Sequence, residues 1–233
     1  MSRVYIISAP SGSGKSTLVN KVREIVPGLK FSISYTTRAP RAGEQNGREY
    51  FFVSPAEFEE MVRKDEFLEH AKFDGNYYGT ARRFLALADQ DGKDLLLDID
   101  VQGAAQIKGR IADAVSIFIM PPNRRELEKR LRTRSLDKEE VIQRRLVTAS
   151  REIENYDKYD YILVNDRLEE SIDALKSILL AERLKRSGAQ QGQRSADDTN
   201  LMANAEHFRL NNVRERLQPI LASFEKAAAP GGR

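Results

Sequence analysis

A glycine-rich segment between an apolar run and a helical pattern constrains this chain more than any other feature. Residues 4–7 are Val-Tyr-Ile-Ile, residues 9–17 are Ala-Pro-Ser-Gly-Ser-Gly-Lys-Ser-Thr, and apolar residues recur at helical spacing over residues 17–25. In a strand, turn and helix of this kind, backbone N–H groups surround phosphate oxygens and the helix N-terminus adds positive potential. The sequence therefore predicts an α/β fold with a binding site for the phosphates of ATP or GTP.

Two side chains of this phosphate-binding loop (P-loop) have specific expected tasks. Lys15 is expected to reach the β- and γ-phosphates, and Ser16 to offer its hydroxyl to Mg²⁺. One position departs from the usual pattern, because Ala9 stands where the first glycine is normally found. The residues predicted to contact the triphosphate are Ala9, Pro10, Ser11, Gly12, Ser13, Gly14, Lys15, Ser16 and Thr17.

The composition makes several other kinds of site improbable. The chain has no cysteine and only two histidines, so disulfides and thiolate sites are excluded and a histidine metal site is not expected. No apolar run is long enough to span a membrane, and the first strand begins without the leader of a secretory signal. We therefore expect a cytoplasmic protein that makes no membrane contact.

The charge distribution favours a small anionic ligand over a nucleic acid. The formal net charge is only +3. Residues 124–145, however, contain nine Lys or Arg against five Asp or Glu. A short basic segment in a balanced chain suits a polyanionic small molecule better than a long duplex, so no nucleic-acid partner is expected.

The order of apolar runs predicts the architecture. Continuous apolar runs at 4–8, 94–99, 115–120 and 161–164 alternate with helical patterns, which predicts a central parallel sheet in a three-layer P-loop fold. Segment 31–80 has shorter strands and many aromatics, and is expected to form a small mixed α/β insertion. The predicted domain covers residues 1–186. A linker over 187–200 and an amphipathic helical extension over 201–233 are expected to follow it.

A second phosphate site is indicated by Arg38 and Arg41, which flank a proline. Planar guanidinium groups match phosphate oxygens, and the hydroxyl of Tyr50 is expected nearby. Such a pair alone is more often a solvated basic loop. Beside a P-loop, it indicates a site for an acceptor phosphate.

Two further clusters bear on the acceptor and the metal. Gly75 and Gly79 bracket a tyrosine pair, which could direct Tyr78 at a ligand, although adjacent tyrosines are most often sheet packing. Asp98 ends an apolar strand, at the edge of the sheet where α/β folds bind ligands, and resembles the acidic residue that supports Mg²⁺ in P-loop enzymes. The alternative for Asp98 and Asp100 is helix N-capping.

Taken in order, these motifs resemble the guanylate kinase family over about residues 3–186. After the P-loop come T-T-R-x-P-R-x-G-E at 36–44, F-L-E-H-A at 67–71, G-N-Y-Y-G-T at 75–80, L-D-I-D-x-Q-G at 97–103 and I-F-I-x-P-P at 117–122. The resemblance implies transfer of the ATP γ-phosphate to GMP, giving ADP and GDP, in purine nucleotide metabolism and GMP recycling. It also implies that a mobile helical lid covers residues 123–147.

The same resemblance implies a role for each site residue. Guanine recognition falls to Ser34, Glu69, Thr80 and Asp100, and the GMP phosphate to Arg38, Arg41, Tyr50 and Tyr78. The transferring phosphoryl group would be surrounded by Lys15, Arg130, Arg134 and Arg145. Asn165 and Asp166 would meet the adenine end of ATP, while Ser16, with Asp98 behind it, would bind Mg²⁺.

Two segments depart from the family pattern, and rival functions stay open. Thr133-Arg134-Ser135 lacks the usual glycines of the lid, and Arg167 follows Asn165-Asp166 in place of an aspartate. The main rival is a catalytically inactive relative that binds phosphopeptides, and a second is a P-loop kinase acting on ribose bisphosphates. The extension is expected to pack on the kinase domain or to mediate self-association. An appendage without a role is an equal alternative, and monomer and homo-oligomer both stay open.

Overall fold

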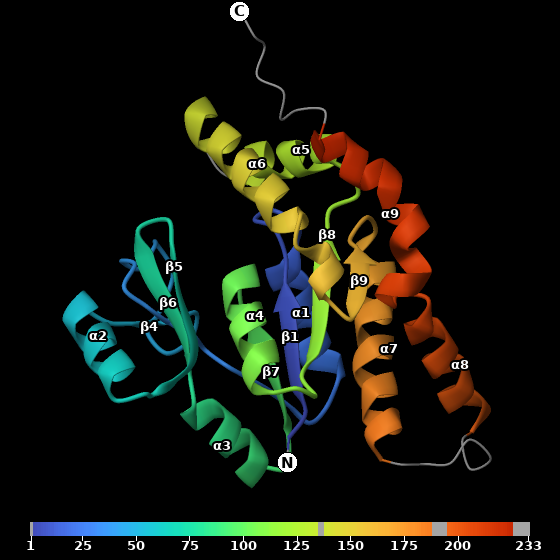
Figure 1. The fold of residues 1–233 in the computed structure, drawn as a ribbon, viewed down its shortest axis with the longest axis horizontal. Helices are drawn as coiled ribbons and strands as arrows, with labels where there is room; N and C mark the ends of the chain where they lie inside the picture. Colours follow the sequence, from blue (N-terminus) through green and yellow to red (C-terminus); the bar gives the residue numbers. More distant parts are fainter. Residues whose placement is uncertain (1, 135–137, 188–194, 226–233) are drawn as a thin grey trace, which may run out of the picture. The chain divides into compact units, whose positions relative to one another are not determined.

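The computed structural model describes residues 2–134, 138–187 and 195–225 (Figure 1), and of Arg134 its backbone alone. The predicted lid, linker and extension therefore each fall partly outside the described residues. The chain divides into two compact units, residues 1–6 with 27–115 and residues 7–26 with 116–233. Strand β1 (Val4–Ser8) begins in the first unit and ends in the second.

The first unit contains one small sheet and several strands and helices of the predicted core and insertion. Its elements are β2 (Leu29–Phe31), β3 (Tyr35–Thr36), β4 (Phe51–Phe52), α2 (Pro55–Arg63), β5 (Phe67–Phe73), β6 (Asn76–Ala81), α3 (Arg83–Gln90), β7 (Asp94–Asp98) and α4 (Val101–Arg110). The small sheet has the order β4-β3-β6-β5, so β5 is an edge strand.

The second unit holds the phosphate loop and the helices that follow it. Its elements are α1 (Lys15–Ile25), β8 (Val115–Met120, whose first residue closes the other unit), α5 (Arg124–Arg134), α6 (Glu139–Ile153), the 3-10 turn η1 (Tyr156–Lys158), β9 (Tyr161–Val164), α7 (Leu168–Arg186), α8 (Ala196–Glu206) and α9 (Leu210–Glu225). The central sheet has the order β2-β7-β1-β8-β9, with β2 parallel to β7 and β8 parallel to β9. The predicted α/β class with a central parallel sheet is confirmed.

The predicted core strands agree with the structure, whereas the insertion differs in detail. Strands β1, β7, β8 and β9 follow the four continuous apolar runs, and their central side chains are fully buried. Two short strands, β2 and β3, lie at the start of the insertion, with a break at residues 32–34 between them. The hairpin β5–β6 was not predicted as strands, although the turn Asp74-Gly75 has φ angles of 48° and 80°, as a two-residue hairpin requires.

The C-terminal extension begins earlier than expected and packs on its own unit. Helix α8 starts at Ala196, inside the predicted linker 187–200, because the Ser195 hydroxyl and the Asp198 carboxylate form a reciprocal capping box. Helix α8 lies along α7, and α9 contacts α5, α6 and β9 (Figure 1). The side chains of Val213, Leu217 and Phe224 on α9 are buried.

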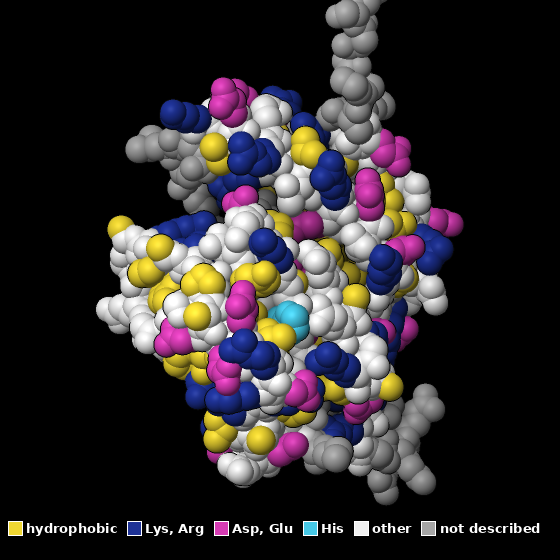
Figure 2. Space-filling model, turned by 60° about the vertical axis from the view of Figure 1, so that its left-hand side comes forward, with side chains coloured by type: hydrophobic (Ala, Val, Ile, Leu, Met, Phe, Trp, Pro, Cys, Tyr) yellow, Lys and Arg dark blue, Asp and Glu magenta, His cyan; other side chains and the backbone are white. Residues whose placement is uncertain are grey.

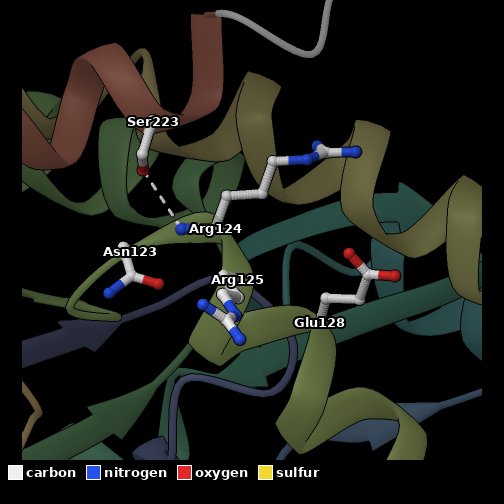
Figure 3. A pocket seen from close by; sticks show the side chains of 5 residues that line it. All are labelled: Asn123, Arg124, Arg125, Glu128 and Ser223. Atoms are coloured by element: carbon white, nitrogen blue, oxygen red, sulfur yellow. Dashed lines mark hydrogen bonds between the residues drawn. The ribbon is translucent and has the colours of Figure 1, made fainter.

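Between α8 and α9 the extension also covers the edge of the central sheet. Ile162 N–H donates to Phe208 O at 2.9 Å, and Leu210 N–H donates to Asp160 O at 3.2 Å. At the start of α5, Arg124 N–H donates to the Ser223 hydroxyl of α9 at 3.1 Å (Figure 3). An edge strand and a helix N-terminus both carry backbone groups in need of partners, and this extension supplies some of them.

A buried ion pair joins the extension to α7. Arg209 Nη2 lies 2.8 Å from Glu182 Oε1, which also accepts the Tyr161 hydroxyl at 2.6 Å and Lys185 Nζ at 3.2 Å. Only 4% of the Glu182 side chain is exposed. Burial alone would raise the pKa of Glu182, but the Tyr161 hydrogen bond and the charges of Lys185 and Arg209 hold it below its ordinary value. A buried carboxylate of this kind depends on its cationic partners.

We therefore expect Arg209→Met to destabilise the chain by about 3 kcal/mol, because the buried Glu182 charge keeps Lys185 and the Tyr161 hydroxyl but loses the guanidinium. Thermal unfolding should show a melting temperature lower by about 6–12 °C. Arg214→Met, at an exposed position on α9, is the matched control. Equal melting temperatures for the two variants would show that the extension contributes little to the stability of this unit.

None of the described helices is long and apolar enough to cross a membrane.

Candidate functional site

The phosphate loop has the backbone conformation that its glycines predict. Gly12 and Gly14 have φ angles of 91° and 88°, a region that other residues rarely adopt. A Cβ atom at Gly12 would lie 2.8 Å from Leu131 Cδ2 of α5, and one at Gly14 would lie 2.3 Å from Asn165 Nδ2. Both positions therefore require glycine for conformation and for space. Helix α1 begins immediately after the loop, at Lys15.

Asn165 lies against the phosphate loop. Its side chain is buried, and Nδ2 donates to Ser13 O at 2.7 Å. The residue after β9 thus holds the phosphate loop from behind, and Asp166 at the next position is exposed. This contact supports the loop, and the adenine contact expected of both residues stays a prediction.

Two of the three predicted lid arginines are brought to this loop. Arg145 of α6 donates from Nη2 to the Ser11 hydroxyl at 2.7 Å. Arg130 of α5 donates from Nη1 to Asn165 O at 2.9 Å and pairs with Glu126 at 3.1 Å. Helix α5 therefore approaches the loop through both Leu131 and Arg130. Arg134 ends α5, and its side chain lies outside the described residues, as does Ser135.

Ion pairs offset part of the positive charge of the basic segment. Arg132 on α5 bonds Glu128 at 2.6 Å and Glu139, at the start of α6, at 2.5 Å. Hydrogen bonds from Arg132 and Gln143 lower the pKa of the Glu139 carboxyl to about 2. The two helices are thus joined by a solvent-exposed bridge, while Arg145 is directed to the phosphate loop.

The first unit contains the second predicted cluster. The Arg38 guanidinium lies 5.3 Å from the ring centre of Tyr50, whose ring is 6.0 Å from that of Tyr78. Arg38 also interacts electrostatically with Tyr78. Three of the four residues expected at the GMP phosphate therefore lie together. The fourth, Arg41, follows in an exposed loop.

Glu44 organises this loop, and sequence reasoning assigned it no role. Its carboxylate accepts Arg38 Nη2 at 2.9 Å and Arg41 N–H at 2.7 Å. Burial alone would raise the pKa of Glu44, but the bonds to Arg41 and Arg38 and the charges of both arginines lower it. The sequence did contain an indication of this role, because Glu44 is the last residue of the T-T-R-x-P-R-x-G-E motif. Glu44 therefore holds the guanidinium of Arg38 and the backbone of Arg41 in the predicted phosphate site.

Two of the predicted guanine-recognition residues, Glu69 and Thr80, form a buried polar pair in the same unit. Glu69 on β5 is 3% exposed, and its Oε1 accepts the Thr80 hydroxyl of β6 at 2.6 Å. The two residues face each other in the β5–β6 pairing. Ser34, the fourth member of the predicted set, lies between β2 and β3, where its carbonyl accepts Phe51 N–H at 2.9 Å.

Asp100 and Gly103 place α4 directly against Glu69. The Asp100 carboxylate caps α4 by accepting Gly103 N–H at 2.8 Å, as the N-capping alternative expects, and its contact with guanine stays a prediction. A Cβ atom at Gly103 would lie only 2.5 Å from Glu69 Oε2. Gly103, which sequence reasoning did not select, is therefore the residue that allows this carboxylate to reach the helix.

The Glu69 carboxyl is strongly perturbed. Its pKa is raised to about 7, mainly by burial and in part by the nearby Asp100 charge, while the hydrogen bond from Thr80 and the charge of Arg110 oppose the shift. Buried carboxyls with such shifts are concentrated at functional sites. When ionised, this group presents two acceptor oxygens to a ligand that carries adjacent N–H donors.

The donor chemistry of the predicted metal residues suits Mg²⁺. Ser16 offers an exposed hydroxyl in the first turn of α1, and Asp98 ends strand β7. Among the described residues, no three His, Cys, Asp or Glu side chains gather into a metal site. Mg²⁺ usually binds one or two protein oxygens and takes its other ligands from phosphates and water. Ser16 therefore fits an ion that arrives with a triphosphate.

On the face drawn in Figure 2, basic and acidic side chains are interspersed. This pattern differs from the continuous basic stripe typical of nucleic-acid binding surfaces.

Comparison with known proteins gives a consistent result. The family model described as guanylate kinase matches residues 1–182. A guanylate kinase of Koribacter versatilis is 55% identical over 230 residues, which cover 97% of each chain. Guanylate kinases of Geobacter metallireducens and Escherichia coli K12 are 50% and 48% identical, over 78% and 81% of this chain and 90% and 92% of their own.

A solved structure gives the same result for the fold. The crystal structure of guanylate kinase from Anaplasma phagocytophilum superposes with a TM-score of 0.66 at 34% sequence identity. The match covers 86% of this chain and 93% of the other.

Proposed function

Because the chain belongs to the guanylate kinase family, we propose that its two clusters bind the two substrates of the family reaction. The chain is an ATP:GMP phosphotransferase, which transfers the γ-phosphate of ATP to GMP. In the proposal the phosphate loop binds ATP, and the clusters around Arg38 and Glu69 bind GMP. The observation that carries this assignment is the buried carboxylate of Glu69 beside Thr80, in a chain that also has an intact Gly14-Lys15-Ser16.

Guanine and the Glu69 cluster have complementary hydrogen-bonding groups. Guanine presents N1–H and an exocyclic amino group, whereas adenine has a bare N1 at the same position. An ionised Glu69, with Asp100 and Ser34 beside it in the proposed set, accepts those donors, and Thr80 holds the carboxylate in place. A site built to bind polar groups discriminates strongly against an analogue that lacks them. This complementarity disfavours a kinase for ribose bisphosphates, which would leave the carboxylate unused.

The proposed chemistry is direct in-line transfer. Four cationic side chains bind the phosphoryl oxygens and neutralise charge as it moves toward the ADP leaving group. These side chains are Lys15, Arg130, Arg134 and Arg145. Ser16, with Asp98 behind it, would hold Mg²⁺, which would supply further charge neutralisation on the phosphates. The GMP phosphate is held by Arg38, Arg41, Tyr50 and Tyr78, so that its oxygen attacks without a covalent enzyme intermediate. Closure of the lid over residues 123–147 excludes water.

The proposal extends to the organisation of the chain and its setting. Residues 1–186 form the kinase domain, with the insertion 31–80 as the GMP-binding part. The extension packs on the second unit through α9, which uses its apolar stripe within one chain and favours packing over self-association. The absence of cysteine suits a cytoplasmic enzyme that recycles GMP.

Product analysis tests the proposal. Incubation with ATP, GMP and Mg²⁺ should give ADP and GDP in equal amounts, and chelation of Mg²⁺ with EDTA should stop the reaction until Mg²⁺ is restored. If ATP is hydrolysed without GDP formation, the acceptor assignment is wrong. If neither nucleotide reacts, the chain is instead the catalytically inactive binding relative.

A further inference from the structure

We propose that Gln106 and Arg110 of α4 are positioning residues that hold Glu69 in the pose required for guanine recognition. This inference rests on the guanine-binding role of Glu69 proposed above. Neither residue belongs to the predicted site. Both form hydrogen bonds with the backbone of the strand that carries Glu69, and the charge of Arg110 also acts on the Glu69 carboxyl.

The β5 strand is irregular just before Glu69. The β5–β6 pairing passes from Phe67 with Ala81 directly to Glu69 with Thr80, so Leu68 is an extra residue in β5. A β-bulge of this kind bends the strand and turns the following side chain, and it leaves the local hydrogen-bond ladder incomplete. The orientation of Glu69 therefore depends on how this bulge is held.

Arg110 binds the bulge from its open side. Its Nη1 donates to Leu68 O and, at 3.3 Å, to Phe67 O. Because β5 is the edge strand of its sheet, carbonyls that point away from β6 have no neighbouring strand to bind them. The guanidinium supplies that partner at the two residues that precede Glu69.

Gln106 binds the residue that follows Glu69. Its Nε2 donates to His70 O at 2.8 Å, and its Oε1 accepts His70 N–H at 3.3 Å. One side-chain amide thus pairs with both backbone groups of an edge residue, as a neighbouring strand would. Together the two side chains fix the backbone on both sides of Glu69.

Helix α4 also limits the Glu69 side chain directly. Gly103 lies on the same helix, where a Cβ would approach Glu69 Oε2 to 2.5 Å, and the Asp100 cap fixes the start of that helix. A shift of β5 relative to α4 would therefore move the carboxylate relative to both Gly103 and Asp100. Small displacements of a recognition group can cost large factors in catalytic efficiency.

The test uses two variants, Gln106→Met and Arg110→Met, which keep a long unbranched side chain but remove the hydrogen bonds. The control is Gln90→Met, which replaces an exposed glutamine of α3 in the same unit. We expect each of the first two to raise KM for GMP about tenfold, with kcat and KM for ATP changed less than twofold. Arg110→Lys retains a hydrogen-bond donor, so its KM for GMP should return most of the way to the wild-type value. Gln90→Met should match the wild type.

A double-mutant cycle separates positioning from general stability. If Gln106 acts through Glu69, Gln106→Met should add little to the GMP defect of Glu69→Gln. Additive effects in this cycle, or an unchanged KM for GMP in both single variants, would overturn the inference. A normal KM for GMP in Glu69→Gln itself would instead refute the proposed role of Glu69. Should Gln106→Met fail to fold, the same cycle is run with Arg110→Met and its lysine rescue.

Discussion

Replacement of Lys15 by alanine is expected to lower kcat about 10³-fold, with a much smaller change in KM for GMP. Lys15 begins α1 directly after a loop whose Gly12 and Gly14 adopt the conformations that direct backbone N–H groups at phosphates. Its charge is expected to matter most as negative charge shifts toward the leaving group, and cations in this position contribute factors of about 10³–10⁵. Steady-state kinetics with each substrate varied would measure both parameters.

Lys21→Ala removes a lysine from an exposed position on the same helix and is the matched control. It should leave kcat unchanged. A Lys15→Ala enzyme that keeps kcat within tenfold of the wild type would contradict the assigned role, as would one whose defect lies mainly in KM for GMP.

The second large effect is expected for Glu69→Gln, which should lower kcat/KM for GMP about 100-fold, mainly through KM. The amide keeps the shape of the side chain and can still accept the Thr80 hydroxyl, but it replaces one of two acceptor oxygens with a donor. That donor would face the N–H groups of guanine, and an unmatched buried polar contact of this kind is costly. Glu59→Gln, at an exposed position on α2, is the control.

The pH dependence gives an independent measure of the same group. Burial raises the pKa of Glu69 to about 7, and only the ionised form accepts both guanine donors. For the wild type, KM for GMP should therefore fall as the pH rises through about 7. The Gln variant should lack this change and retain only the titration of the GMP phosphate. A wild-type profile identical to that of Glu69→Gln would contradict the assignment.

The raised pKa of Glu69 also makes the stability of the ligand-free chain depend on pH: stability falls over the pH range in which GMP binding is expected to improve. Because the pKa of Glu69 is higher in the folded chain than its ordinary 4.5, the folded state binds this proton more tightly. The resulting contribution to stability is fully present below about pH 4.5 and is lost as the pH rises through about 7. Glu69 thus costs stability in the ionised form that the proposed function requires.

Local patterns in the sequence were sufficient for much of the site. The phosphate loop and the strand ends depend on neighbouring residues, so spacing and residue type predicted them, and the cap at Asp100 was one of two alternatives for that residue. The cluster of Arg38, Tyr50 and Tyr78 was expected from its family motifs. In the structure the ring of Tyr50 lies 5.3 Å from the Arg38 guanidinium and 6.0 Å from the ring of Tyr78.

The features that sequence reasoning missed depend on contacts between distant segments. The bond from Gln106 to His70 spans 36 residues, and the bond from Arg110 to Leu68 spans 42. No local pattern indicates that a helix amide will complete an edge strand, or that Asn165 will hold Ser13. The start of α8, in contrast, depends on a local pattern. The capping pair Ser195 and Asp198 was visible in the sequence, but it lay within a stretch of linker-like composition.

The most direct test of the central claim is ADP release from MgATP with GMP, AMP, UMP and CMP compared as acceptors. Binding of guanine by Glu69 and of ATP by the phosphate loop in one chain predicts strong turnover with GMP and little with the other three. Comparable turnover with AMP would show that the carboxylate cluster does not select the base. No turnover with any acceptor would show that the intact phosphate loop does not support transfer.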